Sequence, residues 1–207
     1  IGVRLVGSEM CIRDSPNCTL PREQCPRTTN PGRTHRFYTG KPVVPFGFGL
    51  SYSSFKYSFT NEPPPALSLD PLRRLLDHHA ASGRTFLSKA GAAKEDGGPV
   101  DGAAVAFFVS VTNTGKMDAD DVVLGFLEPP GAGKSNVPRQ SLFGFERVHV
   151  KAGATVCVTL YPALSEFARI TSAGTYQVHA GEYTVRFGLR ETAELGMGLI
   201  EHKLNAY

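Results

Sequence analysis

Residues 103–127, AAVAFFVSVTNTGKMDADDVVLGFL, decide the fold class of this chain. Apolar residues occupy both alternating faces of residues 105–111, many of them β-branched or aromatic, and this predicts a strand. Asn113, Gly115 and Asp118 then supply turn chemistry, because Asn and Gly tolerate a positive φ. Residues 122–127 predict a second strand. Since both faces of each strand carry apolar residues, the stretch favours a packed sheet sandwich over a lone hairpin.

The same alternation extends outward from this stretch. It predicts further short strands at residues 55–59, 142–150, 156–160 and 180–187, and a helical turn at 165–170. Together with the central pair these make about six or seven short strands separated by turns, a pattern typical of an immunoglobulin-like β-sandwich. The sequence therefore predicts an all-β fold.

Residues 61–102 interrupt the strand pattern and are interpreted as an insertion. Asp70 followed by Pro71 predicts a helix start, an N-cap with proline at the first helical position. Leu72, Leu75 and Leu76 follow at helical spacing, and a short helix is therefore expected before Gly83. Residues 88–102 are small and Gly-rich, and we expect a mobile surface segment there.

The N-terminal region shows little regular patterning. Residues 9–15, EMCIRDS, resemble a translated sequencing-library adapter, so residues 1–15 are interpreted as non-native. Residues 16–44 are polar and Pro-rich, and we expect them to wrap over a surface. Residues 45–52, PFGFGLSY, place two glycines between aromatics, which predicts a tight bend with the rings packed beneath it.

Composition excludes several classes of protein. The formal net charge of +3 has no Lys/Arg run to localise it, so no nucleic-acid partner is expected. No apolar run approaches ~20 residues, so no membrane partner is expected either. Cys18 and Cys25 could form a disulfide, and the absence of any C-x-x-C pair argues against a zinc site. Asn17 begins an N-glycosylation sequon that matters only if the chain is secreted.

Two glycine-containing motifs suggest nucleotide chemistry but fit it poorly. Gly133-Lys134-Ser135 looks like the end of a phosphate-binding loop, yet Glu128 stands where that loop needs its first glycine. The sequence 47-GFG-49 begins a dinucleotide fingerprint, but Tyr52 occupies its third glycine position. A turn and a packing bend are the favoured interpretations, and no cofactor is predicted.

Several polar groups could serve as metal ligands or catalytic residues, but simpler structural roles are favoured for them. Asp118, Asp120 and Asp121 could seat a cation, but the glycine and glutamate of a calcium loop are missing, so a solvated turn is favoured. The scattered histidines, serines and carboxylates form no recognisable metal or nucleophile site. The carboxylates considered for acid–base chemistry are Glu128, Glu146, Glu166 and Glu182. No catalytic, cofactor-binding or metal-binding residue is predicted.

Several ordered motifs resemble glycoside hydrolase family 3, the family of β-xylosidases and β-glucosidases. Residues 30–40 (NPGRTHRFYTG) and 44–52 (VPFGFGLSY) resemble the end of that family's α/β-sandwich domain. Residues 111–115 (VTNTG), 122–127 (VVLGFL), 138–148 (PRQSLFGFERV) and 180–188 (AGEYTVRFG) resemble its fibronectin type III-like domain. The sequence Arg147-Val148-His149 favours the xylosidase branch, whereas Ala180 replaces the usual proline and the 61–102 insertion is longer than usual.

The resemblance implies a domain organisation and a parent function. Residues 16–50 would be the tail of a missing α/β domain, residues 51–190 the fibronectin type III-like domain with its insertion, and residues 191–207 a C-terminal tail. The family's nucleophile and acid/base residue lie in regions outside this chain. We therefore expect an inactive accessory fragment of a secreted exo-glycosidase that acts on oligosaccharides. It would pack on the missing catalytic domains. The alternative is a carbohydrate- or partner-binding module that uses Tyr38, Phe48 and Tyr52.

Overall fold

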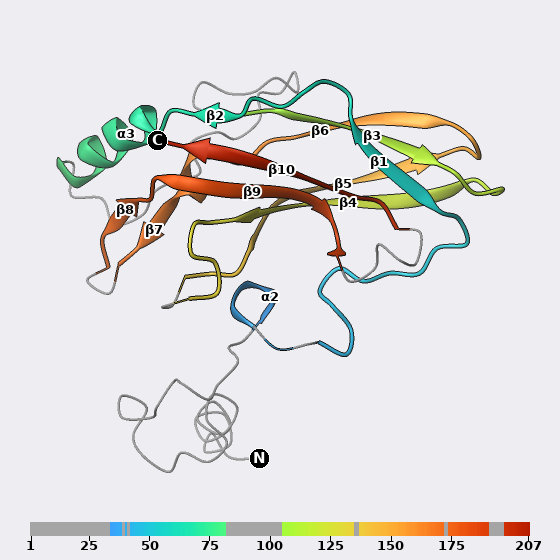
Figure 1. Cartoon of the computed structure of the whole chain (residues 1–207), viewed down its shortest axis with the longest axis horizontal. Coiled ribbons are helices and arrows are strands. Elements are labelled where there is room, and N and C mark those ends of the chain that lie inside the picture. The colour runs from blue at the N-terminus through green and yellow to red at the C-terminus, as the bar shows by residue number, and fades with distance from the viewer. Residues whose placement is uncertain are drawn as a thin grey trace, which may run out of the picture.

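The computed structural model describes residues 34–38, 40, 42–81, 105–134, 137–171, 174–190 and 197–207. The expected adapter segment, the possible Cys18–Cys25 disulfide, the Asn17 sequon and the Gly-rich segment at 88–102 lie outside these residues. Within them the chain is mostly β, and two sheets enclose the main core (Figure 1). The all-β expectation is confirmed at this level.

The smaller sheet has the order β1-β3-β6. Strands β1 (Phe55–Phe59) and β6 (Thr155–Leu160) flank β3 (Phe107–Asn113), and both pair with it antiparallel. Tyr57 lies opposite Val111, and Val109 lies opposite Val158. Buried residues alternate with exposed or half-buried ones along β3, as its period-two pattern predicts.

The larger sheet has the order β2-β10-β9-β4-β5. It contains β2 (Ala66–Leu67), β4 (Ala119–Glu128), β5 (Ser141–Val150), β9 (Gly181–Gly188) and β10 (Leu199–Ala206). All pairs are antiparallel except β2 with β10. The two central strands predicted from residues 103–127 therefore pair in different sheets, and the connection between them crosses the sandwich.

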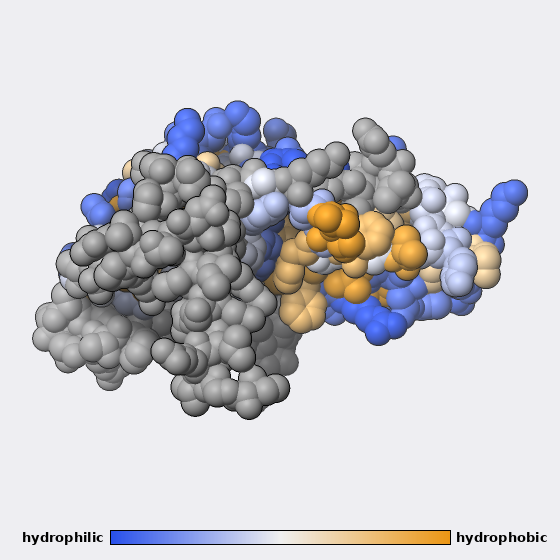
Figure 2. Space-filling view, turned by 90° about the horizontal axis from the view of Figure 1, so that it is seen from below, coloured by the Kyte–Doolittle hydropathy of each residue, from blue (hydrophilic) through white to orange (hydrophobic). Residues whose placement is uncertain are grey.

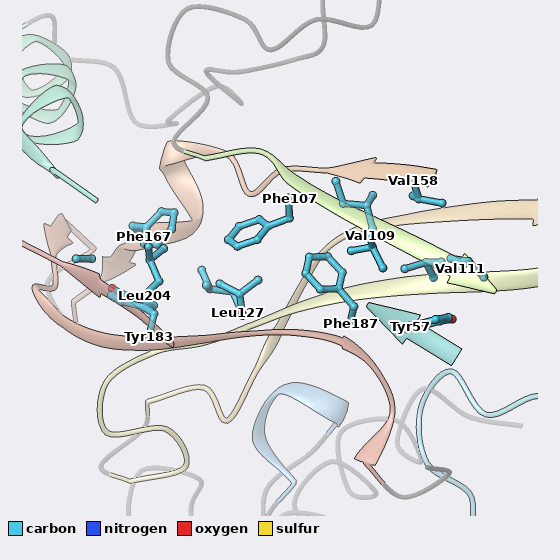
Figure 3. Close-up of a cluster of buried hydrophobic side chains, with 14 of the residues drawn as sticks. Tyr57, Phe107, Val109, Val111, Leu127, Val158, Phe167, Tyr183, Phe187 and Leu204 are labelled. Carbon is cyan, nitrogen blue, oxygen red and sulfur yellow. The ribbon is translucent and has the colours of Figure 1, made fainter. Parts of the chain in front are cut away.

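The core lies between the two sheets. Figure 3 shows Phe107 and Val109 of β3 directed toward Leu127 of β4 and Phe187 of β9. The ring centroids of Phe107 and Phe187 are 5.6 Å apart, and both side chains are fully buried. Each such ring contributes roughly 1.5–3 kcal/mol on burial.

The turn sequence VTNTG at residues 111–115 has a different physical basis from the one expected. Neither Asn113 nor Gly115 has a positive φ. Asn113 ends β3 fully buried, and Gly115 is small because a Cβ there would lie 2.0 Å from Oγ of Ser53. The expectation of a left-handed backbone at these positions was wrong. The constraint is lack of space and side-chain hydrogen bonding.

The predicted insertion is partly integrated into the domain. Helix α3 (Asp70–Ala81) begins at the predicted Asp70-Pro71 signal. Leu69 and Leu72 are fully buried in the core, and β2 pairs with the end of β10. At least residues 66–72 therefore belong to the packed structure, because their side chains and backbone bonds complete one end of it.

The C-terminal segment is likewise part of the fold. Residues 199–206, expected to lie in a tail, form β10 and pair along the whole length of β9. Leu204 and Ala206 are buried. Two further short strands, β7 (Ala168–Ile170) and β8 (Tyr176–Val178), form a hairpin after the 3-10 turn η3 (Leu164–Phe167), which replaces the helical turn expected at 165–170.

Candidate functional site

The segment before β1 lies against one side of the sandwich. It begins with the short helix α2 (Thr34–Phe37), at the lower side of Figure 1. The backbone N–H of Arg139 donates to the carbonyl oxygen of Arg36 at 2.5 Å. The Phe48 N–H donates to the Pro45 carbonyl at 3.1 Å, and Gly47 has a φ of 85°. The tight bend predicted at residues 45–52 is therefore present.

An aromatic stack joins this segment to the larger sheet. The rings of His35 and Phe46 are stacked, with centroids 4.0 Å apart, and both meet the ring of Phe126 at an angle. Phe126 of β4 is fully buried. Burial, together with the neighbouring charge of Arg36, holds the pKa of His35 below its usual value. A neutral imidazole is suited to this apolar contact.

A buried arginine lies over the ring of Phe126. The Arg186 guanidinium carbon is 4.6 Å from the Phe126 ring centroid, and the side chain is only 3% exposed. Arg186 donates to the Gly188 carbonyl at 2.6 Å, to Gln140 Oε1, and to Glu128 at 3.3 Å. Because a buried charge requires pairing, this network explains how an arginine is accommodated inside the sheet.

The network continues to the C-terminal strand. Arg190 donates to Glu128 at 2.8 Å and to Glu201 of β10 at 2.5 Å. Burial works against the charged form, but the hydrogen bond to Glu201 and the charge of Glu128 leave the pKa of Arg190 above its usual value. The two arginines, Arg186 and Arg190, are thus balanced by the two carboxylates of Glu128 and Glu201, which indicates a structural role for Glu128.

The N-terminal segment presents an exposed apolar surface to solvent. Figure 2, viewed from below, shows hydrophobic side chains gathered on the side where this segment lies in Figure 1. Tyr52 is 96% exposed, and Leu50 is 88% exposed. We define the N-terminal apolar surface as Val43, Val44, Phe46, Leu50 and Tyr52, all of which are exposed. Solvated aliphatic and aromatic side chains at this density mark an interaction surface.

The aromatic side chains expected to bind a sugar differ in exposure. Tyr52 is almost fully exposed, whereas Tyr38 and Phe48 are half-buried. The Tyr38 carbonyl accepts a hydrogen bond from Arg139 at 3.4 Å, so this residue also helps to anchor the segment. Of the three, only Tyr52 presents a ring available for stacking.

The three central aspartates have separate structural partners. Asp118 accepts the Ala152 N–H at 2.8 Å, and Asp120 pairs with Arg147 and His149 at 2.6 and 2.7 Å. Asp121 is buried and accepts the Tyr57 hydroxyl at 2.6 Å. Among the described residues, no group of three or more potential ligands could hold a metal ion.

The remaining candidate groups lie apart from one another. Gly133 sits in a turn with φ 76°, and no helix follows Lys134 in the described residues, unlike a phosphate-binding loop. Glu182 pairs with Lys203 at 2.8 Å. His202 lies 2.9 Å from the Pro64 carbonyl, and the His179 carbonyl accepts the Tyr183 hydroxyl at 2.7 Å. Each of these groups has a structural role at its own position.

Among the cavities that open on the described surface, two have a volume of about 310 Å³ each. One lies beneath the N-terminal segment, lined by residues such as His35, Phe46 and Arg139. The other lies between α2, the β4–β5 connection and the β7–β8 hairpin. No helix in the described part of the chain is long and apolar enough to cross a membrane.

Comparison with known proteins identifies the region. Residues 121–190 match the family model of the fibronectin type III-like domain. A probable exo-1,4-beta-xylosidase of Aspergillus fumigatus is 34% identical over 169 residues, which cover 81% of this chain and 20% of that protein. Beta-D-xylosidase 1 of Arabidopsis thaliana is 32% identical over 76% of this chain and 20% of its own length.

Solved structures show the same fold. An exo-beta-xylosidase of glycoside hydrolase family 3 matches with a TM-score of 0.63 and 23% identity, over 90% of this chain and 21% of that chain. A beta-glucosidase from Listeria innocua matches with a TM-score of 0.56 and 18% identity, over 88% and 20%. The chain thus spans about one fifth of the length of the relatives it matches.

Proposed function

On the premise that this chain carries the fibronectin type III-like domain of glycoside hydrolase family 3 proteins, we propose that it is the C-terminal part of an exo-acting, β-xylosidase-like enzyme. In that role it is a non-catalytic accessory domain with an immunoglobulin-like arrangement of its two sheets. The observation that carries the proposal is coverage: 81% of this chain matches only 20% of an exo-1,4-beta-xylosidase.

The chemistry of the described residues supports a non-catalytic role. Retaining hydrolysis requires two carboxyl groups about 5–5.5 Å apart that flank the scissile bond. Glu128 is held by Arg186 and Arg190, and Glu182 is held by Lys203. Such neutralised carboxylates stabilise strands and are poorly suited to proton transfer at a sugar.

The N-terminal apolar surface supports intramolecular packing on catalytic domains outside this chain. Its side chains lie in residues 42–52, directly before the first strand, and residues 30–52 resemble the end of the family's α/β domain. Leu50 is almost fully exposed and would gain roughly 1.5–3 kcal/mol if fully buried, whereas the partly buried Phe46 would gain less. We therefore propose a domain boundary near residue 50, with residues 16–50 belonging to the missing domain.

The test of the proposal is activity of the purified 207-residue chain. We expect no turnover of an aryl β-xyloside above the buffer rate, while an intact family 3 β-xylosidase assayed in parallel turns it over. Turnover by the chain comparable to the intact enzyme would refute the accessory role. The full-length protein should release xylose from the same substrate.

A carbohydrate-binding module is the second candidate, and the exposure of Tyr52 is the observation that favours it. Stacking on one ring contributes little affinity without further polar groups. Titration with xylo-oligosaccharides, followed by amide shifts in NMR, tests this directly. No response at about millimolar ligand would exclude it, and a response lost in Tyr52→Ser would establish it.

A further inference from the structure

The second cavity lies apart from the N-terminal apolar surface and has a distinct chemistry. It is formed by α2, the connection between β4 and β5, and the β7–β8 hairpin, which gather at the lower left of Figure 1. At about 310 Å³ it is at the lower end of the range for small-molecule sites, enough for a single ring-sized ligand.

Two arginines line this cavity without an ionic partner among the described residues. Arg169 of β7 donates through Nη2 to the Pro130 carbonyl at 2.7 Å, and its Nε has no hydrogen-bond partner. Arg36 of α2 makes its closest aromatic contact with the Phe37 ring, 5.7 Å from the centroid. Glu166 also lines the cavity, so the three charges leave a net positive wall.

The charge of Arg169 also acts on two neighbouring titratable groups, His179 and Tyr183. Burial lowers the pKa of His179, and the charge of Arg169 lowers it further. Burial also raises the pKa of Tyr183 to about 12, although the same arginine acts in the opposite direction. The Arg169 charge therefore acts on the β8–β9 connection, at His179, and on β9, at Tyr183.

The rest of the cavity wall is suited to the body of a ligand. Phe37, Leu127, Pro129, Ile170 and Tyr176 supply apolar and aromatic surface, and Ser141 and Ser165 supply hydroxyl groups. A guanidinium group binds a carboxylate with charge-assisted hydrogen bonds. The geometry points to a binding site for a small ring-sized ligand that carries one carboxylate, held by Arg169 and Arg36.

The test compares two probes that share a ring and differ in the carboxylate, D-glucuronate and D-glucose. Amide shifts of the 207-residue chain should saturate with glucuronate at a Kd of about 1 mM or below and cluster around β7 and α2. Glucose should give no saturable shift. An equal response to glucose, or to inorganic phosphate, would overturn the stated ligand class, and absence of saturation with glucuronate would overturn the site.

Substitutions distinguish binding at this cavity from a general effect of the protein's positive charge. Arg169→Gln should weaken glucuronate binding at least about tenfold, and Arg169→Lys, which keeps the charge, should weaken it less. Arg147→Gln removes the same charge from β5, where the arginine pairs with Asp120, and should change the Kd less than about twofold. If Arg169→Gln disturbs the fold, Arg36→Gln on exposed α2 provides the same test. Unchanged affinity in both variants would refute the assignment.

Discussion

Replacing Asn113 by alanine should be among the most destabilising single substitutions in this domain. Its amide is fully buried and uses its whole hydrogen-bonding capacity. Nδ2 donates to the carbonyls of Met117 and Val150 at 2.8 and 2.9 Å. Oδ1 accepts from Ser53 Oγ and the Gly115 N–H at 2.6 and 2.9 Å. One side chain thus joins β3, the segment before β1, and the end of β5.

The size of the stability loss depends on which of the four former partners of Asn113 can hydrogen-bond to water instead. The bonds to Val150 and Ser53 are buried, whereas those to Met117 and Gly115 are only partly buried and can be replaced by solvent. A buried group left without its partner costs about 1–3 kcal/mol. With the smaller losses at the other two bonds, Asn113→Ala should lower the free energy of unfolding by about 3–5 kcal/mol, a large share of the 5–15 kcal/mol typical of a domain.

Guanidinium denaturation followed by far-UV circular dichroism or tyrosine fluorescence measures this loss, since the chain has no tryptophan. Asn205→Ala, on the exposed face of β10, is the matched control and should change stability by less than about 0.5 kcal/mol. Asn113→Asp keeps the acceptor but sets a carboxylate against two carbonyls, so part of its loss should be recovered at low pH. A loss below about 1 kcal/mol for Asn113→Ala, with an unchanged m-value, would refute the reasoning.

Three further predictions concern space, titration and exposure. Gly115→Ala should lower the free energy of unfolding by about 1–3 kcal/mol in thermal unfolding, because its Cβ would lie 2.0 Å from Ser53 Oγ. The control Gly49→Ala, whose Cβ would have nothing within 4 Å, should be neutral. Equal effects of the two substitutions would contradict the steric argument. Burial raises the pKa of the Asp121 carboxyl in the folded protein. The free energy of unfolding of the native protein, compared with that of Asp121→Asn, should therefore fall as the pH rises above the unfolded pKa of about 4. Denaturation of both proteins between pH 3.5 and 7 measures this slope, and a flat or opposite slope would disprove the prediction. Leu50→Ser should raise solubility without changing the melting temperature, as measured by precipitation and calorimetry, because the side chain is 88% exposed; a lowered melting temperature would mean that it packs into the domain.

The contacts of residues 34–48 bear on whether the sandwich can fold without its N-terminal segment. His35 and Phe46 cover Phe126, and Arg139 donates to the Arg36 carbonyl. Deleting residues 1–44 should therefore expose one edge of Phe126, with a modest loss of stability alongside any gain in solubility. We predict that residues 45–207 still fold on their own, and the melting temperature of the deletion variant measures this.

Local chemistry in the sequence determined most strands and the helix start. Period-two alternation in residues 105–111 specifies a strand, since successive side chains point to opposite faces whatever the partner is. Asp70-Pro71 specifies a helix N-terminus for the same local reason, and α3 begins there. Likewise the Gly-containing bend at residues 45–48 depends only on backbone conformations that its own residues allow.

Only the tertiary structure decided which strands pair and which polar groups become buried. Strands β3 and β4 are neighbours in sequence but lie in different sheets, because each finds its partners through long-range contacts that alternation does not encode. Residues 199–206 were expected to lie in a tail, yet they form β10 by pairing with β9. Arg186 looks like an ordinary surface arginine in sequence, and its burial becomes favourable only where Glu128, Gln140 and the Phe126 ring converge on it.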